Sequence, residues 1–392
     1  MPLVTYYLSP VSCPLYNGVM FIERPTKIEY RKIFTVILAK THLDASLFLG
    51  LLLLACFGLI ILSSAIHETP KLFDRQLIGL ALSFLVMCGC AQLKPRQYQI
   101  LAPWLFGAIT ILLLTVLCLG IVSKGAQRWL NIGLLRFQPS EIMKIAMPLM
   151  LAWYFKNKIL PPKLKDLFIC SVIILIPAII IAKQPDLGTA IIVVISGIVV
   201  LLLAGTNWRI LTSLTGLILL SCPLAWHFMH DYQKERLLVF LNPENDPLGS
   251  GYNIIQSKIA IGSGGLFGKG LLHGTQIHLQ FLPTHATDFI FAVCGEELGF
   301  AGCAILIAIF FYILIYSLYI SYKAPDTFSR LATGGIGFTF FASFFVNMGM
   351  VTGLLPVVGL PLPLVSFGGT SLVTTMAAFG ILMAIHANKK LF

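Results

Sequence analysis

The chain has few charged residues. Asp, Glu, Lys and Arg make up only 11% of it, whereas about a quarter of the residues of an ordinary soluble domain are charged. The regular alternation of apolar and polar residues that marks the strands of a membrane β-barrel is also missing. What fills the chain is 57% hydrophobic residues, with a mean hydropathy of +0.89. These features exclude a soluble domain and predict a protein that crosses a membrane as α-helices, which satisfy their own backbone hydrogen bonds.

Patterns typical of nucleic-acid, zinc or disulfide proteins are missing too. The formal net charge of +11 comes from Lys and Arg in short loops between apolar stretches, and no continuous basic run exists, so we expect no nucleic-acid partner. The nine cysteines form no C-x-x-C pair and have no accompanying His ligands. Neither a cysteine metal site nor a disulfide framework is expected.

Apolar stretches long enough to cross a hydrocarbon layer of ~30 Å recur along the chain. They predict an all-α polytopic membrane protein of about ten transmembrane helices, with one large loop, residues 230–287, between the seventh and eighth. Residues 1–43 are rich in proline and basic residues without a long apolar core, which favours a cytoplasmic tail over a signal peptide. Residues 44–392 are then a single transmembrane domain. The expected spans are 46–66, 76–93, 99–122, 139–155, 167–182, 188–205, 208–229, 288–320, 330–354 and 364–387.

The distribution of basic residues predicts the orientation. Positive charge in short loops resists translocation, and the larger share of Lys and Arg lies in the tail and in loops that would share one side with it. We therefore expect both termini in the cytoplasm and the long loop outside. The rule has little force in long loops, so four basic residues there do not weigh against this orientation: Lys234, Arg236, Lys258 and Lys269.

Two groups of charges are not explained by topology. In the fourth span, Glu141 and Lys144 are three residues apart, hence on one face of a helix that Pro139 would begin. They form either a structural ion pair near the interface or, because ionisable groups in a span usually face a cavity, part of a functional site. Asp186, in a short outer turn, either caps the next helix or faces a substrate.

Glu296 and Glu297 lie within the eighth span. Neither can face lipid cheaply, and both lie deeper than Asp288, so we expect a buried, hydrogen-bonded pair that serves architecture.

The long loop has a polar, glycine-rich pattern. Tyr252, Ile255 and Ile259 recur at helical spacing, as the apolar face of a helix lying on the membrane interface would. Glycines crowd residues 262–274, yet their spacing fails the G-x-x-x-x-G-K-[ST] pattern, so flexible turns near a ligand are expected rather than a phosphate loop. The loop region also carries histidines whose spacing matches no zinc signature: His227, His230, His273, His278 and His285.

The last connection, residues 356–371, is rich in proline and glycine. Such backbone is tolerated at membrane depth where it lines a cavity or is buried in protein.

Several motifs, in order along the chain, resemble those of the SEDS family of membrane glycosyltransferases, and within it the branch that acts in cell elongation. The resemblance covers residues 44–392 and is specific because the motifs occur together. They are Ser123-Lys124-Gly125-Ala126-Gln127-Arg128-Trp129, Arg136-Phe137-Gln138-Pro139-Ser140-Glu141, Gln184-Pro185-Asp186-Leu187-Gly188-Thr189, Asp246-Pro247-Leu248-Gly249 with Gln256-Ser257-Lys258, Thr287-Asp288-Phe289-Ile290-Phe291 with Glu296-Glu297-Leu298-Gly299, and Pro361-Leu362-Pro363-Leu364-Val365-Ser366.

The resemblance implies a peptidoglycan polymerase that joins lipid II into β-1,4 glycan strands at the outer face of the bacterial cytoplasmic membrane. It implies three kinds of partner: a class B penicillin-binding protein, other membrane proteins of the elongation complex, and membrane lipid. A divalent cation such as magnesium is implied as well. Asp288 matches the family's essential aspartate, and the residues expected to bind substrate are Glu141, Lys144, Arg128, Gln138, Asp186 and Lys258.

The hypothesis for Asp288 is a general base for the acceptor hydroxyl, with a cation-holding role as the alternative. One departure lies just before it, where Pro283-Thr284-His285-Ala286 lacks the family's glutamate and has the histidine one position early. Two other function classes compete: a transporter that flips lipid II, and a non-catalytic scaffold. No internal repeat is found and the candidate residues lie near the outer surface, which favours the enzyme.

Overall fold

The computed structural model describes residues 43–66, 70–123, 126–132, 135–207, 250–275 and 286–388, together with 209, 212, 216, 234, 238–242 and 246. Helices occupy nine of the ten expected spans in these residues, and the remaining one, 208–229, lies almost wholly outside them, as do residues 1–42. The helices are α2 (Ala45–Ala65), α3 (Pro70–Ala91), α4 (Pro95–Leu119), α5 (Pro139–Phe155), α6 (Leu164–Lys183), α7 (Leu187–Leu203), α12 (Ile290–Tyr322), α13 (Thr327–Val351) and α14 (Gly369–Ala387).

Seven of these helices are long and apolar enough to cross a membrane, and α7 is a shorter apolar helix. The all-α polytopic fold is confirmed. That residues 44–392 form one domain stays a prediction.

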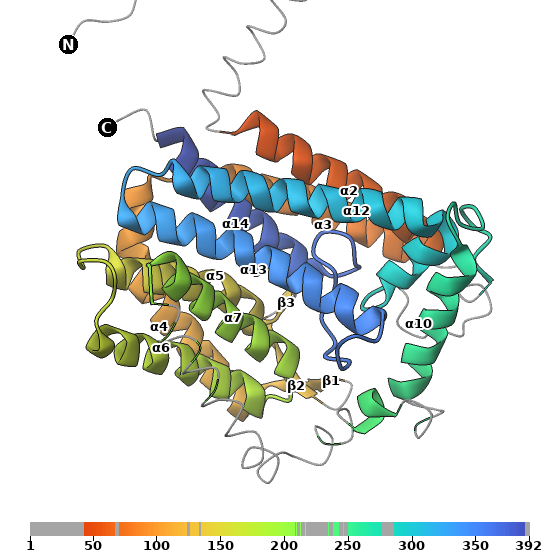
Figure 1. Ribbon diagram of the computed structural model, residues 1–392, viewed down its shortest axis with the longest axis horizontal. Helices are drawn as coiled ribbons and strands as arrows, with labels where there is room; N and C mark the ends of the chain where they lie inside the picture. The colour runs from red at the N-terminus through yellow and green to blue at the C-terminus, as the bar shows by residue number, and fades with distance from the viewer. Residues whose placement is uncertain are drawn as a thin grey trace, which may run out of the picture.

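The helices run side by side along the longest axis of the molecule (Figure 1). At one end, His386 Nε2 near the end of α14 lies 3.3 Å from Asp44 Oδ2, the residue before α2, and Tyr316 donates a hydrogen bond to the same carboxylate at 3.0 Å. The first and last described helices thus meet at one end, which we call the tail end. An even number of crossings, such as the ten predicted, produces this arrangement.

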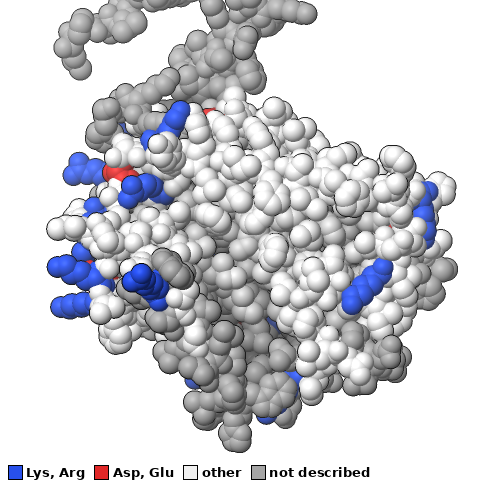
Figure 2. All heavy atoms as spheres, viewed as in Figure 1, with Lys and Arg blue, Asp and Glu red and all other residues white. Residues whose placement is uncertain are grey.

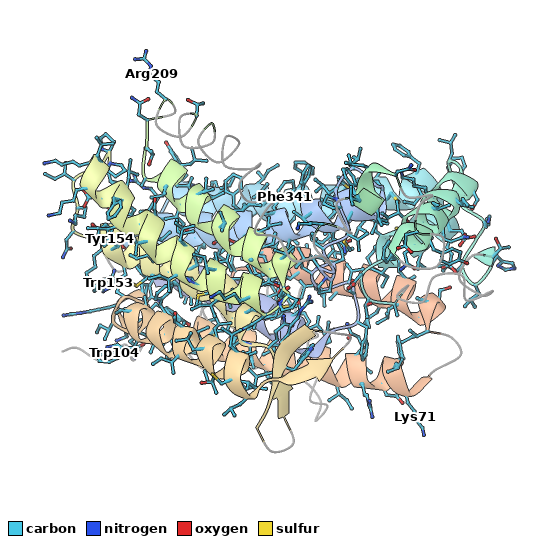
Figure 3. All side chains as sticks on the ribbon, turned by 90° about the horizontal axis from the view of Figure 1, so that it is seen from below. Lys71, Trp104, Trp153, Tyr154, Arg209 and Phe341 are labelled. Atoms are coloured by element: carbon cyan, nitrogen blue, oxygen red, sulfur yellow. The ribbon has the colours of Figure 1, made fainter. Side chains whose placement is uncertain are left out.

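Charges and aromatic side chains mark the tail end. Figure 2 shows Lys and Arg gathered at the left edge, where α14 ends. Lys156 lies 5.2 Å from the ring centre of Trp153, and Lys158 lies 5.0 Å from that of Tyr154 (Figure 3). Aromatic rings beside cations are typical of a membrane interface. This is the end expected to face the cytoplasm.

A small antiparallel sheet between α4 and α5 was not predicted. Its strands are β1 (Ile121–Ser123), β2 (Ala126–Ile132) and β3 (Leu135–Phe137), in the order β1-β2-β3, with Leu130 opposite Phe137. The sheet lies at the end of the bundle opposite the tail end, which we call the hairpin end. The α6–α7 turn and the α13–α14 connection lie at the hairpin end too (Figure 1).

The expected interfacial helix exists as α10 (Ser250–Gly264), which lies across the hairpin ends of α12 and α13 (Figure 1). The predicted apolar residues Tyr252, Ile255 and Ile259 are not buried in the bundle, and Ile259 is 46% exposed, so that this face lies on the membrane interface stays a prediction. The opposite, buried face was not predicted and consists of Ile254, Ser257 and Ala260. The reason is close packing: Ser257 Oγ donates a hydrogen bond to the carbonyl of Val351 at 2.8 Å, and small side chains allow that approach.

The glycine-rich segment after α10 fills a break in α12. Gly299 has non-helical dihedrals (φ 65°, ψ −161°), which leaves backbone groups on either side without helical partners. The loop supplies them: the amides of Lys269 and Gly270 donate to the carbonyls of Glu296 and Glu297 at 3.0 Å, and Phe300 N and Ala301 N donate to the carbonyls of Gly265 and Leu266 at 2.9 and 3.0 Å.

Only glycine allows this approach, because a Cβ on Gly268 would lie 2.1 Å from the carbonyl oxygen of Glu297. The acidic pair holds the same junction: Glu296 accepts from Lys269 at 2.7 Å and Glu297 from Ser64 at 2.5 Å. The architectural role predicted for the pair is confirmed, and the glycines serve packing rather than a flexible turn.

Candidate functional site

A polar cavity of about 340 Å³ lies at the hairpin end. Residues from β2, the start of α5, the α6–α7 turn, the turn before α12 and the α13–α14 connection line it. It brings together five of the seven predicted site residues: Arg128, Gln138, Glu141, Asp186 and Asp288.

Asp288 lies in a turn just before α12, with a half-buried side chain. Its backbone carbonyl accepts a hydrogen bond from Asn347 Nδ2 at 2.8 Å. The carboxylate lies beside Gly359, where an added Cβ would be 3.7 Å from Oδ2.

The α13–α14 connection holds the Asp288 turn in place. Ser366 Oγ accepts from Leu362 N at 2.8 Å and donates to the carbonyl of Thr287, and Phe367 N donates to the carbonyl of Ala286 at 2.9 Å. Gln76 of α3 in turn donates to the carbonyl of Ser366 at 3.2 Å. The proline-rich connection therefore both lines the cavity and positions the acid.

Sequence reasoning assigned no role to Asn347, Gln76 or Ser366. A signal existed for Asn347, which is a lone amide inside an apolar helix, where a polar group is costly unless it has partners.

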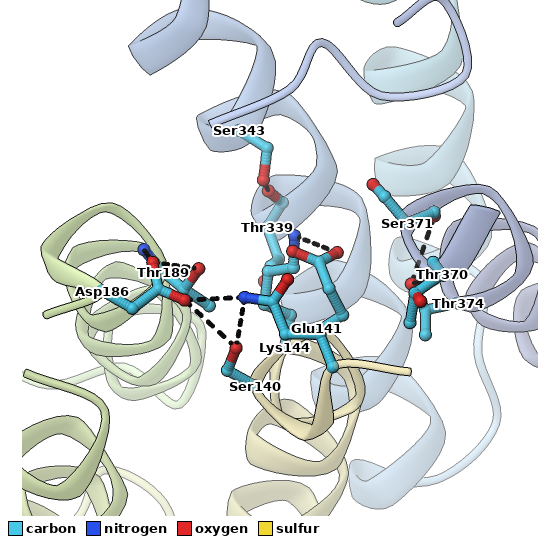
Figure 4. A network of polar contacts seen from close by, with 11 residues as sticks. Ser140, Glu141, Lys144, Asp186, Thr189, Thr339, Ser343, Thr370, Ser371 and Thr374 are labelled. Atoms are coloured by element: carbon cyan, nitrogen blue, oxygen red, sulfur yellow. Dashed lines mark hydrogen bonds and ion pairs between the residues drawn. The ribbon is translucent and has the colours of Figure 1, made fainter. Parts of the chain in front are cut away.

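Asp186 joins three elements (Figure 4). Its carboxylate accepts from Gln138 Nε2 at 2.7 Å and from Ser140 Oγ at 3.3 Å at the start of α5, and from the hydroxyl and amide of Thr189 in α7 at 3.0 and 3.4 Å. Arg128 Nη1 of β2 lies 3.8 Å away. The helix-capping role is confirmed, and the same carboxylate lines the cavity.

Glu141 and Lys144 form the expected ion pair, with Lys144 Nζ 2.7 Å from Glu141 Oε2. Pro139 begins α5, as predicted. Both side chains are largely buried, and Glu141 also lines a second cavity, of about 40 Å³, that includes Lys144, Thr339 and Ser343 (Figure 4). The pair faces cavities and not lipid.

The other predicted residues lie elsewhere or outside the described residues. Lys258 is exposed on α10, its stem packs beside Gly353 just after α13, and it does not line the large cavity. Residues 283–285 of the altered segment, Lys124 and four of the five histidines of the loop region, His227, His230, His278 and His285, lie outside the described residues. His273 is exposed, with Nδ1 2.8 Å from the carbonyl of Leu271.

Metal ligands are sparse in the described part of the chain. No three His, Cys, Asp or Glu side chains there come close enough together to hold a metal ion. Asp186 already accepts several hydrogen bonds, and Glu141 is paired with Lys144.

Comparison with known proteins gives a consistent result. A family model described as "Cell cycle protein" and covering FtsW, RodA and SpoVE matches residues 38–391. The peptidoglycan glycosyltransferase MrdB of Escherichia coli K12 is 49% identical over 353 residues, which cover 90% of this chain and 95% of that protein. The protein of the same name from Helicobacter pylori strain 26695 is 42% identical over 306 residues, 75% of this chain and 78% of the relative.

Solved structures match as well. One, described as "Structural coordination of polymerization and crosslinking by a peptidoglycan synthase complex", has a TM-score of 0.79 and 31% identity, covering 88% of this chain and 98% of the other. The rod shape determining protein RodA of Thermus thermophilus has a TM-score of 0.68 and 29% identity, covering 88% and 97%.

Proposed function

This chain belongs to the FtsW/RodA/SpoVE family, and we infer that it is a peptidoglycan glycosyltransferase that polymerises lipid II into β-1,4 glycan strands during cell elongation. The observation that carries the proposal is the cavity of about 340 Å³, which joins the Asp288 carboxylate to Arg128 and Glu141 at one end of a membrane bundle. The reaction needs a carboxylate that accepts a proton, cations that neutralise the pyrophosphate, and a site inside the membrane bundle that a lipid-linked substrate can reach.

In the reaction, the hydroxyl of the acceptor sugar attacks the anomeric carbon of the donor. A new glycosidic bond forms, and the bond from that carbon to the polyprenyl pyrophosphate breaks, with inversion and without a protein nucleophile. Asp288 takes the proton from the attacking hydroxyl as general base. Its place in a turn anchored by Asn347 and Ser366 fixes the carboxylate relative to the cavity.

The cations stabilise the charge that develops on the departing pyrophosphate. Arg128 lines the cavity directly, and Lys144 lies behind Glu141, which borders both cavities. Such preorganised charges lower the barrier because they need no rearrangement as the bond breaks. Asp186, which bonds to Gln138 before α5 and lies beside Arg128, fixes the position of Arg128 relative to the start of α5. Lys258, outside the cavity lining, is proposed to contact substrate parts that extend past it.

A divalent cation fits this proposal only with substrate oxygens among its ligands, because the described residues gather no protein-only site. Asp288 is the side chain that would hold it. When bound, such an ion would neutralise charge on the pyrophosphate.

The location and partners follow from the same proposal. The chain is a multi-pass membrane protein, proposed to lie in the bacterial cytoplasmic membrane with the tail end inside and the hairpin end outside. A transpeptidase of the class B penicillin-binding type is the proposed partner, supported by the similar structure described as a synthase complex for polymerization and crosslinking.

A polymerisation assay tests the function. Purified full-length protein is incubated with lipid II, with and without the transpeptidase, and glycan strands are resolved by length. The wild type and Asp74→Asn, an exposed acid on α3, are expected to form strands, whereas Asp288→Ala forms none. Strand formation by Asp288→Ala would contradict the assignment. Lipid II translocation into liposomes without polymerisation would instead support the transporter.

A further inference from the structure

A second recess lies on the outside of the bundle, between the last turns of α6 and the first turns of α7. Its volume is about 320 Å³. Alanines form its floor, since Ala178 and Ala190 are buried, and two exposed isoleucines form its rims, Ile179 and Ile191. All of its lining is apolar: Ala178, Ile179, Ala182, Ala190, Ile191, Val194 and Ile195. We call it the α6–α7 groove.

The groove and the polar cavity lie on either side of one turn. Asp186 and Thr189 line the cavity, whereas Ala190, the next residue, lines the groove. Ala190 is four residues from Asp186, the N-cap of α7, which is about one helical turn, or ~6 Å along the axis. Ala182 is in the last turn of α6, on the other side of the same short connection. A molecule lying in the groove therefore has its end beside the site.

A cation stands at that end of the groove. Lys183 is the last residue of α6 and is exposed. It follows Ile179 by four residues, so it projects from the same face of α6 that forms the groove rim. No ion pair involves Lys183 within the described part of the chain. Arg128 approaches the same turn from the cavity side, donating to the carbonyl of Pro185.

We propose that the α6–α7 groove binds the polyprenyl chain of the lipid-linked substrate and that Lys183 contacts its phosphate, an inference that rests on the proposed function. An apolar groove with a cation at its cavity end complements an apolar chain with an anionic head. An apolar transmembrane helix of a partner would fit less well. It would cover Lys183 with apolar surface, and burying an unpaired charge is costly.

Filling the groove tests the proposal. Ala182→Phe and Ala178→Leu put side chains into the space, and Ala108→Phe, at an exposed alanine of α4, is the matched control. With C55 lipid II, the groove variants are expected to raise KM about tenfold with kcat unchanged, which corresponds to losing part of the chain's burial. With an analogue that has a ten-carbon chain, they are expected to match the control, since a short chain does not reach along the groove.

The head contact needs a separate variant. Lys183→Met is expected to raise KM for both the long-chain and the short-chain analogue, whereas Lys165→Met, at the other end of α6, leaves both unchanged. Equal KM values for Ala182→Phe, Ala178→Leu and Ala108→Phe would overturn the proposal. An increase in KM of the groove variants that is the same for both chain lengths would also overturn the proposal.

A binding measurement separates this proposal from the polymerase function. Radiolabelled undecaprenyl pyrophosphate is titrated onto full-length protein in nanodiscs, with undecaprenol and inorganic pyrophosphate as competitors. If Ala182→Phe binds undecaprenyl pyrophosphate more weakly than Ala108→Phe does, at equal thermal stability, the result supports lipid binding in the groove even if no polymerisation is found. Equal binding rejects the groove while leaving the polymerase intact. Displacement of a partner helix, or altered crosslinking of residues 208–229, without a change in lipid binding would assign the groove to a protein occupant instead.

Discussion

The side-chain amide of Asn347 joins the turn of Asp288 to the loop that faces it. Its Nδ2 donates to the carbonyl of Asp288 at 2.8 Å and to the carbonyl of Leu360 at 2.6 Å, and the residue is fully buried. One side chain of α13 thus sets the distance between the candidate base and the backbone that forms the opposite side of its pocket.

Replacing Asn347 by Asp is expected to lower kcat about 10²-fold with KM for lipid II changed less than about twofold. The new carboxylate cannot donate to two carbonyls, so the Asp288 turn shifts, and a shift of ~1 Å in a reacting group costs about this much. Steady-state polymerisation by the purified variant checks it. Asn207→Asp, at an exposed site, is the control. A fall in thermal stability with normal kcat would show that Asn347 is only structural.

Asp186 and Asp326 form a matched pair of helix caps. Each accepts a hydrogen bond from the backbone amide three residues on, Asp186 at the start of α7 and Asp326 at the start of α13. Changing either to Ala is expected to cost about 1 kcal/mol of stability. Only Asp186→Ala should also lower kcat/KM, by about tenfold or more, because it releases Arg128 and Gln138 as well. Equal activity of the two variants would restrict Asp186 to capping.

The Glu141–Lys144 pair can be tested with a double-mutant cycle. Lys144→Met leaves a buried carboxylate without its cation and is expected to cost about 3–5 kcal/mol. The double variant Glu141→Gln/Lys144→Met removes both charges and should recover most of that stability. It should not recover polymerisation, because Lys144, the cation behind Glu141, no longer adds positive potential to the cavity that is proposed to hold the pyrophosphate. Full activity of a stable double variant would mean that the pair is structural only.

The pair of Lys158 and Asp166 at the tail end predicts a pH effect. A hydrogen bond to Asp166, at 3.0 Å, raises the pKa of Lys158 above its ordinary value. A raised lysine pKa stabilises the fold fully below the unfolded pKa of about 10.4, and this contribution is lost as pH rises through the folded pKa. The difference in thermal unfolding between wild type and Lys158→Met should therefore be constant from pH 7 to 9 and shrink above about pH 10.5. A difference that grows with pH would contradict the contact.

The sequence predicted those features that depend on local pattern. Helices are present in nine of the ten spans that the long apolar stretches predicted. Such stretches are informative because about 20 apolar residues are needed to cross a bilayer. Pro139 located the start of α5, and Asp186 the start of α7. Five site residues from distant motifs came together in one cavity, as their family resemblance implied.

Features that depend on tertiary contacts were missed. The sheet at 121–137 continues an apolar span, so hydropathy alone extended α4 to residue 122. The buried face of α10 includes the small residues Ser257 and Ala260, and Ser257 contacts the carbonyl of Val351 at the end of α13, so burial there follows small size rather than hydrophobicity. Asn347 bonds to backbone carbonyls that the fold brings near, which no sequence spacing reveals.

The most direct test of the central claim is the rate of lipid II polymerisation by purified Asp288→Asn, which keeps the size of the side chain and removes its basicity. We expect a loss of about 10³-fold or more, within the range that general bases supply, with unchanged thermal stability and unchanged lipid II binding. Wild-type polymerisation by Asp288→Asn would contradict the assignment of Asp288 as the base.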